Sequence, residues 1–454
     1  MRAEIFQNAI NSIADAGREM LNRRFSANNK AENGTEVKIS QLCKELLSEK
    51  GEAMGTALAR TVIERYKSLD EEGRLSFFIT LRDEFEPETE VLEDAIYTYL
   101  NDPTRENRQD LEKAVEAPRQ ALIRAMNMAP GGTSALLKMR EDLQQCLKQD
   151  KSLRVVDADF VHLFSSWFNR GFLRIREISW ETPATVLEKI IKYEAVHAIA
   201  DWSDLRRRLE TDRRCYGFFH PALMGEPLIF VEVALTKELS DAVQPLLEPD
   251  NVTKAEDADT AIFYSISNCQ QGLKGISFGN FLIKQVVMEL KQELPNIKTF
   301  STLSPVPMFR KWLDSNLDDF PEQDDELGTW LKTSEFAESF HEFKQRNVDS
   351  ASDFKDKDRD LLIKLCTYYL TEVKKGSAPY DPVARFHLGN GARLERVNWS
   401  GDVSPNGIRQ SYGMMVNYLY DLSSIEKNHE AFVNNNEVIV SDTVAKILAI
   451  DKKR

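Results

Sequence analysis

The sequence is poor in cysteine. Only five cysteines occur among the 454 residues, and none forms a CxxC pair or stands at metal-ligand spacing from a histidine. A small secreted scaffold needs dense disulfides and a zinc finger needs paired ligands, so both classes are excluded. An odd, scattered set of cysteines fits a reducing intracellular compartment. The five are Cys43, Cys146, Cys215, Cys269 and Cys366.

Long apolar runs are also missing. No stretch approaches the roughly 18 apolar residues that a membrane-spanning helix requires. Glu4 and Asp15 interrupt the region where a signal peptide would carry its apolar segment. The last four residues, 451–454, do not form a peroxisomal targeting signal. We therefore expect a cytoplasmic protein without a membrane partner.

Positive charge is in the minority. The chain has 59 lysines and arginines against 73 aspartates and glutamates, which gives a formal net charge of −14. Nucleic acids and anionic lipid surfaces bind basic proteins, so neither is an expected partner. An anionic substrate would need a local basic patch. The 42% hydrophobic and 29% charged residues are typical of a globular protein.

The first third of the chain has the periodicity of helices. Apolar residues recur every three or four positions over 6–20 and every four positions over 54–66, and further amphipathic segments cover 74–83, 109–127 and 134–148. No alternation of the kind that predicts strands is sustained in this part. We predict an all-helical bundle domain over residues 1–155.

The pattern changes near residue 155. All six tryptophans follow residue 160, and strand-like runs of β-branched and aromatic residues begin. The first two runs are joined by the short segment 224–227, which predicts antiparallel neighbours. The chain is thus expected to be α+β, with a second domain over 156–454. The predicted strands are 215–219, 228–235, 261–266, 298–303, 394–399 and 414–420, and the main predicted helices are 281–295, ending at Pro295, 328–345 and 359–375.

A glycine-containing loop over 268–279 stands between a predicted strand and a predicted helix. Such a loop can turn backbone N–H groups, together with the positive end of the helix, toward a phosphate. Neither a Walker motif nor GxGxxG is present. Residues 275–279 match the GxSxG motif of serine hydrolases, but polar residues separate Ser277 from the strand, which disfavours a nucleophile elbow. A plain flexible connection remains an alternative.

Two further residues stand in settings that suit chemistry. Ser304 follows a predicted strand and precedes Pro305 and Pro307, which stiffen the backbone; the alternative is a helix cap. His387 lies in a short predicted helix that ends at Gly389. The other five histidines have no paired spacing, so they are expected to pack or to lie at the surface, and no metal site is expected.

These stretches resemble the malonyl-CoA decarboxylase family. The resemblance is carried by 263–267, 270–275, 281–284, 303–307, 382–388 and 398–404, and it covers about 160–420. It implies a helical N-terminal domain followed by a GNAT-like mixed-sheet catalytic domain. It also implies that Ser304 and His387 lie at the malonyl group, with Tyr420 as a supporting hydroxyl. The residues that it places on CoA are Lys274, Gly275, Ile276, Ser277, Phe278, Gly279 and Asn280.

The reaction that the resemblance implies converts malonyl-CoA to acetyl-CoA and CO2 through an enolate. The thioester carbonyl accepts the electron pair, so no metal or organic cofactor is expected, and CoA belongs to the substrate. By the resemblance, Ser304 takes the proton-acceptor side and His387 is the proton donor. The alternative is a CoA-dependent GNAT-type acyltransferase, which would share the loop but pass the acyl group to an acceptor.

The helical part contains no convergent set of catalytic residue types. Amphipathic helices bury their apolar stripes against one another, and a stripe that is left over forms a self-complementary surface. We therefore expect residues 1–155 to be an oligomerisation domain and the protein to be a homodimer or a homotetramer. An independent bundle on a monomeric enzyme is the alternative.

Overall fold

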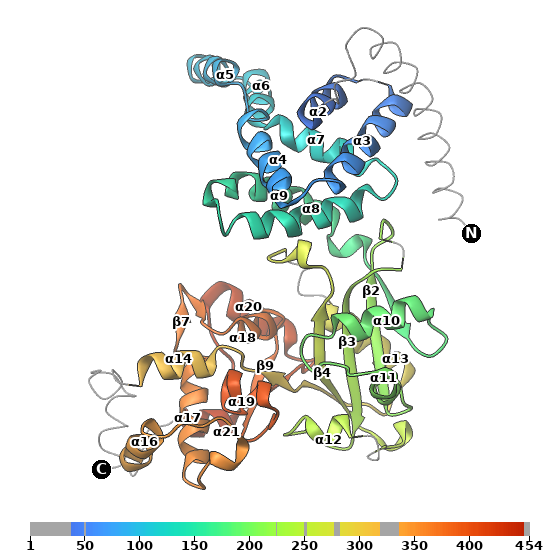
Figure 1. Ribbon diagram of the computed structural model, residues 1–454. Coiled ribbons are helices and arrows are strands. Elements are labelled where there is room, and N and C mark those ends of the chain that lie inside the picture. Colours follow the sequence, from blue (N-terminus) through green and yellow to red (C-terminus); the bar gives the residue numbers. More distant parts are fainter. Residues whose placement is uncertain are drawn as a thin grey trace. The chain divides into compact units, whose positions relative to one another are not determined.

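The structure is a computed structural model in which residues 38–49, 51–223, 225–248, 252–276, 282–317 and 336–448 are described (Figure 1). The helix expected over 6–20 lies outside these residues, as does the first part of the helix expected over 328–345. The chain divides into two compact units. The first is residues 1–174 with 219–226 and 270–278, and the second comprises 175–218, 227–269 and 279–454.

The first unit is helical, as expected. Leu58, Val62 and Tyr66 recur every four residues on α3 and are all buried, and Tyr66 packs edge-on against Phe77 and Phe78 of α4. The Asp70 side chain accepts the Gly73 N–H at 2.8 Å and so caps α4. The helices are α2 (Ile39–Ser48), α3 (Glu52–Lys67), α4 (Glu71–Asp83), α5 (Thr89–Asn101), α6 (Arg105–Val115), α7 (Pro118–Asn127), α8 (Gly132–Cys146) and α9 (Arg154–Trp167).

Helix α9 runs across the expected domain boundary at 155/156. It packs against α4, α7 and α8, and its Val156, Phe160 and Phe164 are buried. The helical unit therefore continues to residue 174. The change in composition near 155 marks the start of this last aromatic-rich helix, which is still part of the helical packing.

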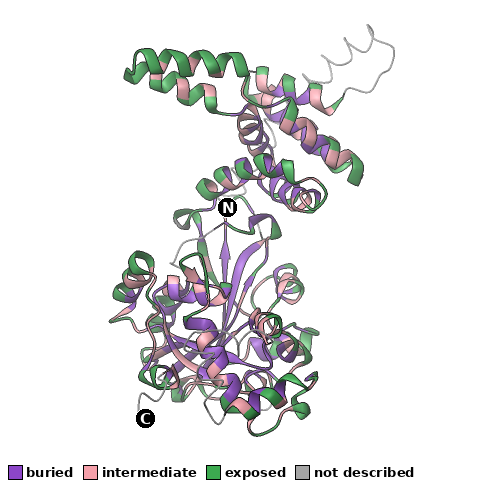
Figure 2. Ribbon diagram, turned by 90° about the vertical axis from the view of Figure 1, so that its left-hand side faces the viewer, coloured by how far each residue is buried: buried purple, intermediate pink, exposed green. Residues whose placement is uncertain are grey.

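The second unit is built on a mixed sheet with the strand order β1-β2-β3-β4-β5-β10-β6, and β9 also pairs with β10. Figure 2 shows that the sheet is largely buried. The strands of this sheet are β1 (Arg174–Ile178), β2 (Arg213–Phe219), β3 (Pro227–Thr236), β4 (Thr260–Asn268), β5 (Thr299–Thr302), β6 (Ser304–Pro305), β9 (Arg393–Asn398) and β10 (Met415–Leu419). A separate two-stranded sheet pairs β7 (Lys374–Lys375) with β8 (Ala378–Pro379).

Helices cover this sheet and complete its core. Leu187 and Ile190 of α10 pack with Phe230 of β3, and Leu246 of α12 packs with Ile262 of β4. The helices of the unit are α10 (Ala184–Tyr193), α11 (Trp202–Arg208), α12 (Gln244–Leu247), α13 (Leu282–Glu293), α14 (Phe309–Asn316), α16 (Phe336–Lys344), α17 (Asp358–Thr371), α18 (Pro382–Gly389), α19 (Pro405–Ser411), α20 (Ile425–Asn435) and α21 (Asp442–Leu448). No helix in the described parts of the chain has the length and apolar character needed to span a bilayer.

The parallel pair β4–β5 positions the site. Its register runs from Thr260 with Thr299 to Phe263 with Thr302, and the rest of β4 has no partner on β5. Beyond this point, Ser304 pairs with Val416 of β10 instead. The order strand, glycine loop, helix α13 and parallel strand is the unit expected of a GNAT-like sheet. The expected α+β class is confirmed, and each of the six predicted strands is present within two residues at either end.

Candidate active site

Three of the predicted site residues meet in the second unit. Ser304 Oγ lies 3.0 Å from His387 Nε2, and His387 Nδ1 lies 2.8 Å from the Tyr420 hydroxyl. All three side chains are buried, with exposed fractions of 5% or less. Residues more than 80 positions apart are thus joined in one hydrogen-bonded row. A serine hydroxyl next to an imidazole can bind and protonate a reacting group.

Ser304 is held by strand pairing at the edge of the sheet. It starts β6, where it pairs with Val416, and its hydroxyl donates to Thr302 Oγ1 at 2.8 Å. Helix α14 begins at Phe309 and has no side-chain cap. The alternative of Ser304 as the cap of this helix is therefore wrong, because the helix starts too late in the chain.

His387 is held by a short, firmly capped helix. Asp381 precedes Pro382 at the start of α18, and its carboxylate accepts the N–H groups of Val383 and Ala384 at 2.9 Å. This buried carboxylate thereby fixes the start of the helix that carries His387.

The row is neutral in the substrate-free protein. Burial lowers the pKa of His387 to about 3 and raises the pKa of the Tyr420 hydroxyl well above its ordinary value. The neutral imidazole carries one N–H. The Ser304 proton forms the hydrogen bond to Thr302. The two bonds of the imidazole then each have one donor when the Tyr420 hydroxyl donates to Nδ1 and the Nε2–H of His387 donates to Ser304.

Sequence reasoning missed two residues of this site. Thr302 accepts from Ser304 and also from the N–H of Tyr418 at 3.2 Å, and the Tyr418 ring stacks on His387 with centroids 4.7 Å apart. Both lie two residues from a predicted site residue on the same strand segment. Alternation along a strand places such residues on one face, so this signal could have found them.

The loop residues belong to the first unit. Lys274 is exposed, Ile276 is buried, and Gly275 has φ +81° with no atom within 4 Å of the place where a Cβ would stand. The structure does not bring these three residues into the hydrogen-bonded row of Ser304. Ser277, Phe278, Gly279 and Asn280 lie outside the described residues.

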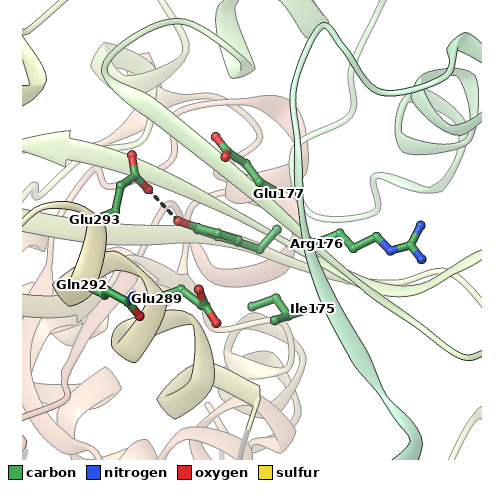
Figure 3. A pocket seen from close by; sticks show the side chains of 7 residues that line it. Ile175, Arg176, Glu177, Glu289, Gln292 and Glu293 are labelled. Atoms are coloured by element: carbon green, nitrogen blue, oxygen red, sulfur yellow. Dashed lines mark hydrogen bonds between the residues drawn. The ribbon is translucent and has the colours of Figure 1, made fainter.

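Two pockets of the second unit differ in their charge. One, of about 420 Å³, is lined by Glu177, Glu289 and Glu293, and the Tyr216 hydroxyl donates to Glu293 at 3.2 Å (Figure 3). Three carboxylates against the single cation of Arg176 repel a polyphosphate, so this pocket does not suit CoA. The other, of about 500 Å³, is lined by Tyr420 among others and includes two lysines. In the described ranges, no group of three or more His, Cys, Asp or Glu side chains could hold a metal.

Comparison with known proteins explains this arrangement. Residues 171–454 match the family model of the malonyl-CoA decarboxylase C-terminal domain, and 85–168 match that of the N-terminal domain. The crystal structure of malonyl-CoA decarboxylase from Rhodopseudomonas palustris is similar with a TM-score of 0.84 and 51% identity, over 90% of this chain and 98% of that one. The chain belongs to the malonyl-CoA decarboxylase family.

Other relatives of the decarboxylase family agree. The structure from Agrobacterium vitis has a TM-score of 0.81 and 46% identity, covering 91% of this chain and all of that one. The mitochondrial malonyl-CoA decarboxylase of Anser anser anser is 39% identical over 352 residues, which are 73% of this chain and 69% of that protein. Membership of this family confirms the expected enzyme class, a carboxy-lyase.

Proposed function

We propose that the protein decarboxylates malonyl-CoA to acetyl-CoA and CO2 through an enolate, with Ser304 and His387 at the malonyl group. The observation that carries the proposal is the buried row Thr302–Ser304–His387–Tyr420 in a member of this family. Its polar atoms are fixed before any substrate arrives. Preorganised donors of this kind stabilise the charge that develops in a transition state.

The electron pair needs no acceptor beyond the substrate. When the bond between the carboxylate carbon and C2 breaks, CO2 leaves and the pair moves into the thioester carbonyl, which becomes the enolate oxygen. The protein has to hold the carboxylate so that the breaking bond overlaps the carbonyl, and to donate hydrogen bonds to the oxygen. This chemistry requires neither a metal nor an organic cofactor.

The proton balance defines the part of His387. Each turnover consumes one proton, because the carboxylate is lost as CO2 and the CH2 group becomes CH3. Burial keeps the imidazole neutral in the free protein. A malonyl carboxylate beside the ring raises its pKa and lets it take up a proton. His387 then delivers that proton to C2, Ser304 hydrogen-bonds the malonyl group, and Tyr420 holds the ring through Nδ1.

The CoA part of the substrate needs separate contacts. We place Lys274 and the backbone of the loop that runs from Gly275 to Asn280 on its phosphates. Lys274 is exposed, and Gly275 has no side chain that could keep a ligand away from its backbone. A local cation and free N–H groups suit phosphate even on a chain of net charge −14.

The test is turnover without an acceptor. Purified protein is incubated with malonyl-CoA and a chelator, and acetyl-CoA is followed by mass while released CO2 is trapped. We expect equal amounts of the two products, and a Ser304→Ala/His387→Asn double variant as the background. Intact malonyl-CoA overturns the proposal. Transfer of the malonyl group to an added amine without CO2 would show the acyltransferase alternative instead.

A cytoplasmic location also stays a proposal. Its support is that all five cysteines are free thiols and buried, as in proteins kept in reducing compartments. The curated relatives carry the word mitochondrial in their names. Fractionation of the source cells, with the protein traced by antibody, decides between the two compartments.

A further inference from the structure

The loop that carries Lys274 and Gly275 is fastened to a helix of the first unit. Arg140 lies on α8 with an exposed fraction of 3%. Its Nη1 donates to the carbonyl oxygens of Gly272 at 2.6 Å and of Lys274 at 3.0 Å. Its Nε donates to Asp157 of α9 at 2.8 Å, which fixes the direction of the guanidinium. A planar, forked guanidinium can make these bonds at once, and an ammonium cannot.

The backbone of the loop also touches α8 directly. A Cβ on Gly272 would stand 2.2 Å from the carbonyl oxygen of Leu137, so only glycine fits there. Glycine at this place serves the contact with the helix. Arg140 and Gly272 together hold the loop against α8, through the two bonded carbonyls and the close approach of the Gly272 backbone.

The hydrogen bond from Arg140 to the Lys274 carbonyl fixes the direction of the Gly275 N–H. In a trans peptide the C=O and N–H groups point in opposite directions. The Lys274 carbonyl faces Arg140, so the N–H of Gly275, in the same peptide unit, points away from α8. This N–H has no acceptor among the residues that the structure describes. A carbonyl that accepts from a cation also polarises its amide and strengthens the N–H as a donor.

We propose that Arg140 is a positioning residue for CoA: it holds the Lys274–Gly275 peptide so that the Gly275 N–H meets a phosphate oxygen of the substrate. The inference rests on the proposed function, which places this loop on CoA. It gives the helical unit a part in substrate binding besides the expected part in assembly. Arg140 itself bonds the loop and Asp157 and acts on the substrate through the loop.

The test distinguishes the orientation of the loop peptide from the positive charge at residue 140. Arg140→Lys keeps the positive charge but cannot hold both carbonyls and Asp157. We expect it to raise the KM for malonyl-CoA and the Kd for CoA by about tenfold, the effect of losing one hydrogen bond to a charged group, with kcat changed less than about threefold. The loss should persist at high salt. Asp157→Asn, which only loosens the guanidinium, should give a smaller rise in the same direction.

A truncated substrate supplies the decisive comparison. Malonyl-pantetheine has the thioester but no pyrophosphate, so wild type and Arg140→Lys should process it with equal kcat/KM. Arg119→Lys is the matched control, because Arg119 is buried in the same unit, pairs with Asp159 and donates to the Phe85 carbonyl, yet has no hydrogen bond to the described loop residues. It should leave the KM for malonyl-CoA unchanged.

Three results overturn the inference. These are an Arg140→Lys protein that binds CoA as tightly as wild type, an equal loss with malonyl-pantetheine, and an equal rise of KM in Arg119→Lys. Failure of the proposed function is distinct, because wild type would then leave malonyl-CoA intact, while CoA binding measured by calorimetry still reports on the loop.

Discussion

The hydroxyl of Ser304 bonds Thr302 and His387, and the imidazole of His387 bonds Ser304 and Tyr420, so both groups are fixed in place. We expect Ser304→Ala and His387→Asn each to lower kcat by about two to three orders of magnitude, since each removes a preorganised group at the transition state. KM should change much less. Ser411→Ala is the control, because Ser411 is buried in the same unit and bonds only backbone carbonyls. Steady-state kinetics measure kcat and KM of these variants. A near-normal kcat in either variant would mean that the replaced residue only packs in the core.

The buried imidazole also makes stability depend on pH. The pKa of His387 is about 3 in the folded protein against 6.5 for a free side chain, so between these values only the unfolded chain binds the proton. The free energy of unfolding therefore falls on acidification below pH about 6.5. Relative to His387→Asn, wild type should lose about 1.4 kcal/mol between pH 7.5 and 5.5. Urea titrations measure this difference, and exposed His162→Asn should track wild type.

Single residues were predictable to different degrees. Ser304, His387 and Tyr420 were named through the family resemblance, because their local settings also fit a cap, a packing histidine and a core tyrosine. Thr302 was missed although strand alternation places it on the face of Ser304, because alternation predicts a shared face and not a shared function. Its role arises only when Ser304 turns its hydroxyl back along the strand. The glycine at 272 has a packing reason that needs helix α8, which no local pattern shows.

Helix α18 depends on its N-cap residue. Asp381 accepts the first N–H groups of the helix, and burial raises its pKa to about 6. We expect Asp381→Ala to cost roughly 1–2 kcal/mol of stability and also to lower kcat, because His387 loses its fixed helix. Asp381→Asn keeps an acceptor oxygen and should therefore retain most of the stability and most of kcat.

Asp201 provides the control for this prediction. It caps α11 in the same way, accepting the N–H groups of Ser203 and Asp204 at 2.8 and 2.9 Å. Asp201→Ala should therefore lower the melting temperature but leave kcat unchanged. Equal kcat in Asp381→Ala and Asp201→Ala would mean that the cap of α18 does not position His387.

At the scale of elements, the long strands were predictable and the short ones were not. Alternation and β-branched residues mark β3 and β4 over their whole length. The two-residue β6 has no pattern of its own and exists because β10 pairs with it. The end of the pairing between β4 and β5 after Phe263 likewise depends on contacts with other strands. It determines the position of Ser304.

At the scale of the whole molecule, the order of a helical part and a sheet part was predictable from the change in residue pattern. The exact division was not. Helix α9 continues the helical packing past residue 155, and residues 270–278 join the helical unit although they follow β4 in the chain. Sequence proximity cannot show that a loop belongs to a distant helix, because the deciding contacts come from Arg140 and Gly272.

The helical unit also carries an exposed surface that we expect to mediate assembly. Helices α5 and α6 pack on each other and contain no buried residue, and Figure 2 shows them mostly exposed. Helix α5 carries acidic residues and no basic ones, whereas the acidic and basic residues of α6 balance. The hairpin also leaves large apolar side chains exposed, and such a surface favours pairing with a second copy in a closed dimer.

We therefore predict that the hairpin of α5 and α6 joins two copies of the chain. Tyr97 and Leu100 are the most exposed large apolar residues on it, at 69% and 73%, and burial against a second copy would remove this surface from water. Light scattering should give a mass above 52.0 kDa for the full chain. Tyr97→Asp/Leu100→Asp should shift it to the monomer, and Met128→Ser, an equally exposed apolar residue on the same unit, should not. A monomeric wild type at micromolar concentration contradicts the assembly without touching the chemistry at Ser304.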